Sequence, residues 1–352
     1  MTSESGKALL ISEHNGHMFP TKSFDPWMKR QEHALRHARV QNDAAADGAH
    51  MGCIGWCMFD YNTHKDFGSG DRICYHGVMD AFRNPKLAAA VYASQQEETP
   101  VLAVGSSMDI GDYPAGNIGE VMVFSNADEV RLYKNNIYVS TLEPGDYPAL
   151  PHGPLVLADT IGELLVTQEG FDQAKADMLK KPLLAAARYG LAGMPKAELA
   201  RMGYAMLRYK MSFKEGVALY GKYVGNWGGE ATAWRFDAIK GGRVVATATC
   251  CPSCKLHLEV KASHTALTEG DTYDMAAVRI RVLDEYGNVT PYAQIPLRLK
   301  LEGPAQLVGP DVVVAEGGMS GTYIKTCGEA GTAKLTVSAD GLTSVAVTFT
   351  VE

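Results

Sequence analysis

Residues 7–13 read KALLISE, an apolar run that ends in a serine and a glutamate. Such a run is typical of a buried parallel strand, and here the acid Glu13 lies at its carboxyl end. A turn that contains Gly16 follows, and residues 27–46 then show helical periodicity, with Pro26 suited to the first turn. We therefore predict a strand, a turn and a helix, which together make one βα unit.

The following segments repeat this order. Residues 53–61 again have the character of a strand, and residues 87–94 are predicted to form a helix that begins after Pro85. Strand, helix, strand and helix in succession are the βα repeat of a parallel α/β fold.

The pattern changes beyond residue 98. Short alternating runs such as residues 121–124 and 130–133, broken by Gly, Pro, Asn and Asp, are typical of a β-sandwich. Helical periodicity interrupts them at about residues 160–220, which we interpret as a helical insertion. We predict one domain over residues 98–265.

Residues 266–352 alternate more regularly between apolar and polar positions. Residues 277–282 read AVRIRV, and a polar turn at residues 284–288 precedes further alternating runs. This spacing predicts a compact immunoglobulin-like, or invasin-like, sandwich as a separate domain. The remaining residues, 1–97, then form the α/β part.

Composition and charge exclude several classes of protein. The 352 residues are 46% hydrophobic and carry a formal charge of −7, which gives no electrostatic reason to bind nucleic acid. No apolar run approaches the ~20 residues of a membrane helix, so we expect no membrane partner. Seven cysteines, an odd number in a long chain, favour a reducing compartment, and we expect a cytoplasmic location.

Three ordered segments resemble a known enzyme family. Residues 11–22, ISEHNGHMFPTK, resemble the nucleophile strand of family 2 glycoside hydrolases of the β-galactosidase type. Residues 55–61, GWCMFDY, resemble the last barrel strand of that family, and residues 66–86 are similar to the loop and helix that follow it. The resemblance implies that residues 1–97 are the last part of a (β/α)8 barrel. It also implies retaining hydrolysis of terminal β-D-galactosides.

The resemblance implies that Glu13 is the nucleophile. A retaining glycosidase needs one carboxylate to attack the anomeric carbon and a second carboxyl group ~5–5.5 Å away, and barrel enzymes carry such groups at the carboxyl ends of strands. The structural alternative is a glutamate at a strand end that pairs with a nearby Arg or Lys. Trp56, at the second strand end, is either a stacking platform for the sugar or a core tryptophan.

The other candidate residues lie in turns. Asn15 and His17 either bind sugar hydroxyls or stabilise the turn after the nucleophile, and Asp60 either orients them or holds its strand end. His76 is a further candidate for substrate binding. It precedes Gly77 where better-known bacterial members have Asn-Gly, so their bound cation is not carried over. We assign no metal ligand and no cofactor to this chain. Whether the full-length enzyme binds a divalent cation is left open.

The general acid/base glutamate is not expected in this chain. The family takes it from an Asn-Glu pair well upstream of the nucleophile, and only twelve residues precede Glu13. We therefore predict one part of a longer or split enzyme, inactive alone, whose partners are a β-galactoside and the N-terminal remainder. Homo-oligomerisation is left open. The alternative is a non-catalytic carbohydrate-binding or structural module, because about three quarters of the residues lie outside residues 1–97.

Three motifs receive structural interpretations. A C-x-x-C pair within residues 250–254 lacks a second Cys/His pair, so we interpret it as a turn. His33 and His37 lack the intervening Glu of a zinc motif and are expected on a half-exposed helix. Residues 225–229, GNWGG, lack the Lys-Ser/Thr of a phosphate loop.

Overall fold

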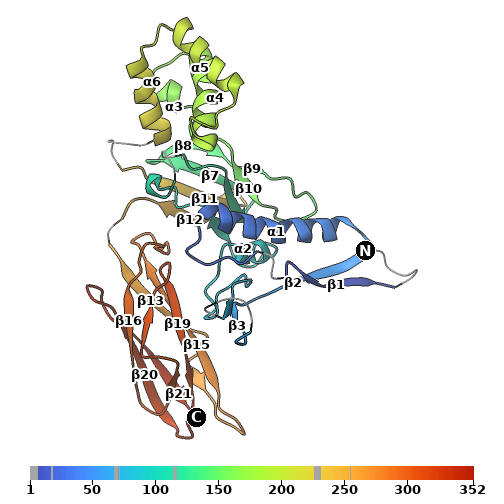
Figure 1. Cartoon of the computed structure of the whole chain (residues 1–352), viewed down its shortest axis with the longest axis vertical. Helices are drawn as coiled ribbons and strands as arrows, with labels where there is room; N and C mark the ends of the chain where they lie inside the picture. Colours follow the sequence, from blue (N-terminus) through green and yellow to red (C-terminus); the bar gives the residue numbers. More distant parts are fainter. Residues whose placement is uncertain are drawn as a thin grey trace. The chain divides into compact units, whose positions relative to one another are not determined.

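The computed structural model describes residues 7–16, 19–66, 70, 72–113, 117–225, 231–253 and 255–352 (Figure 1). Contacts between residues divide the chain into two compact units. The first consists of residues 1–33, 49–89 and 253–352, and the second of residues 34–48 and 90–252. The predicted domain boundaries after residues 97 and 265 stay a prediction.

The first unit begins with a two-stranded parallel sheet. Strands β1 (Leu9–His14) and β2 (His50–Gly55) pair in parallel, and helix α1 (Trp27–Ala46) connects them in sequence. The helix has the predicted bounds. The second strand was predicted over residues 53–61, which is wrong, because the chain leaves the sheet after Gly55. Residues 61–62 instead form the short strand β3 (Tyr61–Asn62), which pairs with β4 (Ile73–Cys74).

Helix α1 is more buried than its sequence suggested. His33 and His37 are 4% and 1% exposed, so the expected half-exposed setting is wrong. They lie on one helix face with Ala34 and Ala38, which are both fully buried. The His37 ring nitrogen Nδ1 lies 2.8 Å from the Tyr92 hydroxyl, which gives this histidine a structural partner.

The predicted C-terminal β-sandwich is confirmed, and its two sheets enclose one apolar core. The first sheet has the order β13 (His257–Ala262), β15 (Met275–Leu283), β19 (Met319–Lys325) and β17 (Gln306–Val308). The second has the order β14 (Ala266–Leu267), β21 (Val345–Val351), β20 (Gly331–Ser338), β16 (Pro296–Glu302) and β18 (Val312–Val314). Along β15, Val278, Ile280 and Val282 are fully buried while Arg279 and Arg281 alternate with them, which is the period of two that the sequence predicted.

The second unit contains two four-stranded sheets. One has the order β5 (Leu102–Val104), β6 (Val121–Ser125), β10 (Leu155–Leu157) and β9 (Glu143–Pro144). The other has the order β12 (Arg243–Cys250), β11 (Trp234–Lys240), β7 (Glu129–Lys134) and β8 (Ile137–Thr141). Gly241 and Gly242 join β11 to β12 with φ of 56° and 74°, a conformation that glycine adopts without steric cost.

Helices follow β10 in the same unit. They are α3 (Leu164–Thr167), α4 (Gln173–Tyr189), α5 (Lys196–Arg208) and α6 (Phe213–Tyr220), followed by a π-helical turn at Gly221–Gly225. The Asp172 carboxylate accepts a hydrogen bond from the Lys175 N–H and thereby caps α4, and Ser212 and Glu215 form a reciprocal cap on α6. No helix within the described ranges is long and apolar enough to cross a membrane.

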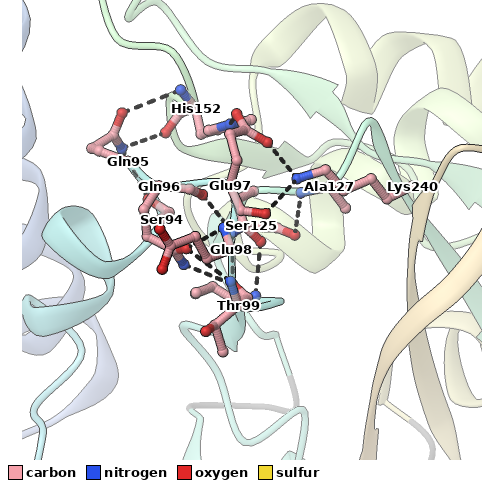
Figure 2. Close-up of polar contacts among 12 residues, drawn as sticks. Ser94, Gln95, Gln96, Glu97, Glu98, Thr99, Ser125, Ala127, His152 and Lys240 are labelled. Atoms are coloured by element: carbon pink, nitrogen blue, oxygen red, sulfur yellow. Dashed lines mark hydrogen bonds and ion pairs between the residues drawn. The ribbon is translucent and has the colours of Figure 1, made fainter.

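A polar cluster joins helix α2 (Ala89–Ala93) to strand β5 within the second unit. Figure 2 shows Glu97 between Lys240, with which it forms an ion pair, and His152, whose ring nitrogen Nε2 lies within hydrogen-bond distance of the Glu97 carboxylate. Hydrogen bonds from these two partners, Lys240 first, lower the pKa of Glu97. The Gln95 amide donates to the His152 carbonyl over 2.8 Å, and the buried Asn126 amide donates to two backbone carbonyls of the same connection. The connection is therefore held by side chains from three other segments.

Candidate active site

Two neighbouring strand ends bring the main sequence candidates together. In the β1–β2 pair, His14 lies opposite Gly55, and the Trp56 N–H donates to the His14 carbonyl over 2.8 Å. Glu13 is the residue before His14, and its side chain is exposed. Because the strands are parallel, their carboxyl ends lie at the same end of the sheet. Glu13 and Trp56 therefore both lie at that end.

The turn after Glu13 is shaped around its carboxylate. Asn15 has φ of 58°, in the left-handed region that Asn tolerates better than most residues. A Cβ added to Gly16 would lie 2.8 Å from Glu13 Oε1, so the carboxylate occupies the space that a side chain would take. The Asn15 side-chain nitrogen Nδ2 is buried and finds no hydrogen-bond partner among the described residues. His17, the other candidate in this turn, lies outside the described residues.

Trp56 presents part of its ring to the surface. It is 40% exposed, and its indole nitrogen Nε1 donates to the Tyr61 hydroxyl over 3.4 Å. The two rings pack edge to face, with centroids 6.1 Å apart and an interplanar angle of 88°. Tyr61 thus fixes one edge of the indole, and an exposed ring surface remains on which the apolar face of a sugar could stack.

Asp60 is buried and holds the chain rather than facing solvent. It is 6% exposed, its Oδ1 lies 2.7 Å from Lys86 Nζ, and it accepts a hydrogen bond from the Gly77 N–H over 2.9 Å. Burial raises the pKa of the Asp60 carboxyl to about 6. Lys86 also donates to the Thr21 carbonyl over 2.7 Å, so one ammonium group joins three segments.

Gly77 lies too close to the Asp60 backbone for any side chain. A Cβ at this position would lie 2.3 Å from the Asp60 nitrogen and 2.3 Å from the Phe59 carbonyl carbon. Only glycine allows this approach. The neighbouring His76 is 6% exposed, and its Nδ1 lies 2.6 Å from the sulfur of the buried Cys74. His76 and Asp60 are therefore both buried groups next to Gly77.

Sequence reasoning missed three residues of this arrangement, namely Gly16, Tyr61 and Lys86. Tyr61 was visible as an aromatic residue five positions after Trp56, although its contact could not be predicted. Lys86 follows Asp60 by 26 positions, and nothing in the sequence marks it as buried. No three His, Cys, Asp or Glu side chains of the described ranges lie together as metal ligands would.

Comparison with known proteins identifies the family. Residues 258–348 match the model of the glycoside hydrolase family 2 C-terminal domain 5. A β-galactosidase from Rhizobium radiobacter is 31% identical over 131 residues, which are 36% of this chain and 92% of that sequence. The chain belongs to glycoside hydrolase family 2. The family predicted from the sequence is thereby confirmed.

Longer relatives and solved structures extend the match along the chain. A β-galactosidase from Thermoanaerobacterium thermosulfurigenes is 32% identical over 314 residues, which are 88% of this chain and 36% of that protein. The chain thus spans about a third of the length of such relatives. The crystal structure of a β-glycosidase from Bacteroides vulgatus shares the fold, with a TM-score of 0.53 and 16% identity over 90% of this chain and 33% of that one.

Proposed function

We propose that this chain carries the nucleophile end of a retaining β-galactosidase, with Glu13 as the nucleophile. One observation carries the proposal: the exposed carboxylate of Glu13 lies at the carboxyl edge of a parallel sheet, beside the strand end that bears the half-exposed Trp56. The name β-galactosidase, which several relatives bear, supports the choice of sugar.

In this proposal β1, α1 and β2 belong to a (β/α)8 barrel that other sequence completes. Each strand of the two-stranded sheet has one edge without a partner among the described residues, and Leu10, Met51 and Ile54 are all half-exposed or more. Unpaired edges and exposed apolar side chains of this kind are normally covered by neighbouring strands and helices. The N-terminal remainder of the enzyme would cover them.

The reaction would proceed in two steps. The Glu13 carboxylate attacks the anomeric carbon while a general acid protonates the leaving oxygen, and the aglycone departs. Water then attacks the glycosyl-enzyme, releases the sugar and restores the Glu13 carboxylate. We assign the general acid/base to the part of the enzyme outside this chain.

The remaining candidates receive supporting roles. The exposed ring of Trp56 would stack on the apolar face of the galactose, and the unpartnered Asn15 amide would donate to a sugar hydroxyl. The buried Asp60 and His76 would hold the strand end and the loop rather than contact the sugar. His17 stays a candidate for sugar binding, and the cytoplasmic location also stays a prediction.

The test is covalent labelling of an active enzyme that contains this chain. A 2-fluoro galactosyl inhibitor should accumulate as a glycosyl-enzyme, and peptide mass mapping should place the label on Glu13. A label on any other residue would refute the assignment. The chain alone should not hydrolyse a nitrophenyl galactoside. Robust turnover by the chain alone would refute the assignment of the general acid/base to a part of the enzyme outside this chain.

A non-catalytic carbohydrate-binding role is the second candidate. It is favoured by a cleft in the second unit, which is lined by Ile118, Leu157, Thr160, Leu184, Arg188 and Tyr189, among others. Tyr189 is 49% exposed there, and Arg188 forms an ion pair with Glu120 of the same cleft. Calorimetric titration with galactosides separates the roles: binding that survives both Glu13→Gln and Trp56→Ala would favour the module.

A further inference from the structure

The loop of residues 78–86, here called the docking loop, is held in one conformation by its own side chains. The Asp80 carboxylate accepts hydrogen bonds from the backbone N–H groups of Phe82 and Asn84, both over 2.8 Å. The Asn84 side-chain nitrogen Nδ2 also donates to it over 2.8 Å, and the Lys86 N–H closes the loop by donating to the Val78 carbonyl. These bonds hold the loop in one conformation, so a displacement of one face of the loop should displace the other face as well.

One face of the docking loop contacts strand β19 of the C-terminal sandwich. The fully buried Asn84 donates a second hydrogen bond to the Ser320 carbonyl over 2.9 Å, and the Tyr323 hydroxyl donates to the Ala81 carbonyl over 2.6 Å. The Phe82 side chain lies over Gly321, where an added Cβ would approach Phe82 Cβ to 2.4 Å. Two hydrogen bonds and a close apolar contact thus fix the loop on the strand.

The other face of the docking loop contacts the segment that carries the candidate site. The Val78 N–H donates to the Cys57 carbonyl over 3.0 Å, and the Met79 N–H donates to the Met58 carbonyl over 2.9 Å. Lys86 forms the buried ion pair with Asp60. Cys57 directly follows Trp56, so the backbone on which Trp56 stands is bonded to a loop that the sandwich holds.

We propose that the C-terminal sandwich positions the candidate site, with Tyr323 and Asn84 as the positioning residues. In this view the sandwich is a working part of the site and not an appended module. The positioning of residues 56–60 follows from the contacts alone, whereas its consequence for sugar binding rests on the proposed function. Loss of the Tyr323 hydroxyl should increase the mobility of residues 56–60 while the sandwich itself remains folded.

Thiol labelling of the whole chain tests this without any sugar or activity. Cys74 is 1% exposed on β4, and Cys57 is half-buried, with a pKa that burial raises to about 11, so both should react slowly with a maleimide. Tyr323→Phe removes one hydroxyl from the sandwich side, and Phe82→Ala removes the packing contact from the loop side. Both variants should raise the labelling rate of Cys74 about tenfold. Tyr323→Phe leaves the part-buried Ala81 carbonyl without its donor and Phe82→Ala removes an apolar contact, and each change lowers local stability by an amount that corresponds to roughly that factor.

Two controls make the result specific to positioning. Tyr292→Phe removes another tyrosine hydroxyl of the same sandwich, which donates to the Ser253 carbonyl, and it should leave the rate at Cys74 within about twofold. The buried Cys250 of the second unit should not gain reactivity, as it would if the whole chain unfolded. An unchanged rate at Cys74 in both test variants, or an equal rise in Tyr292→Phe, would overturn the proposal.

Discussion

Replacement of Lys86 by methionine should destabilise the first unit by about 3–5 kcal/mol at pH 8. The side chains of Lys86 and Asp60 are 3% and 4% exposed, so the substitution leaves a buried carboxylate without its cation. Removal of one partner from a buried ion pair typically costs roughly that amount, because the remaining charge stays desolvated. The Thr21 carbonyl also loses its donor.

The loss should depend on pH in a defined direction. Asp in unfolded chains has a pKa of about 3.9, and burial raises the pKa of Asp60 to about 6 in the native chain. Without the ammonium group of Lys86, the pKa of Asp60 should rise further. A raised pKa in the folded state means stability that is present below the unfolded value and lost as pH rises through the folded value. The difference between variant and native chain should therefore grow from pH 5 to pH 8.

Hydrogen exchange of the backbone amides of Asp60 and Gly77, measured at both pH values, reports this local stability directly. The double variant Lys86→Met with Asp60→Asn is the matched control, since it removes both charges and should recover most of the loss. A loss below about 1 kcal/mol at pH 8, or a loss that does not change with pH, would refute the buried ion pair as the element that holds this strand end.

Two further substitutions test the turn and a helix cap. Gly16→Ala should displace the Glu13 carboxylate and lower the kcat of an active enzyme that contains this chain by roughly 10- to 100-fold, measured with a nitrophenyl galactoside. Gly48→Ala meets no atom within 4 Å and is the control, so equal effects of the two would contradict the prediction. Asp172→Ala should destabilise helix α4 by about 1 kcal/mol, read from exchange at the amide of Lys175, whose exchange would stay unchanged if the cap were irrelevant.

The sequence predicted best where local rules decide the structure. Helix α1 begins directly after Pro26, which suits the first turn of a helix, and β15 follows the alternation of its apolar residues. The strand predicted to extend to Tyr61 was wrong because an apolar run does not mark the residue at which the chain leaves its sheet. Phe59 bridges to Met79 instead of continuing β2, and that pairing depends on residues 20 positions away.

In the candidate site too, residues marked by local sequence were predicted, whereas contacts that depend on the fold were not. Glu13 and Trp56 were predicted because strand ends and the family motifs mark them in the sequence. The ion pair of Asp60 with Lys86 could not be predicted, since it forms only when the fold buries both residues. The burial of His33 and His37 was missed for a similar reason, although Ala34 and Ala38 on the same helix face indicate a close neighbour.

Gly77 carries a consequence for how mutational scans of this region should be interpreted. Every substitution there forces a side chain into backbone atoms, so saturation mutagenesis will rank the position among the least tolerant of the chain. It holds no reactive group, however, and its intolerance would measure steric room alone. A ranking of residues by loss of activity alone would thus give Gly77 the same rank as Glu13, the proposed nucleophile, and chemical rescue or covalent trapping is needed to tell the two apart.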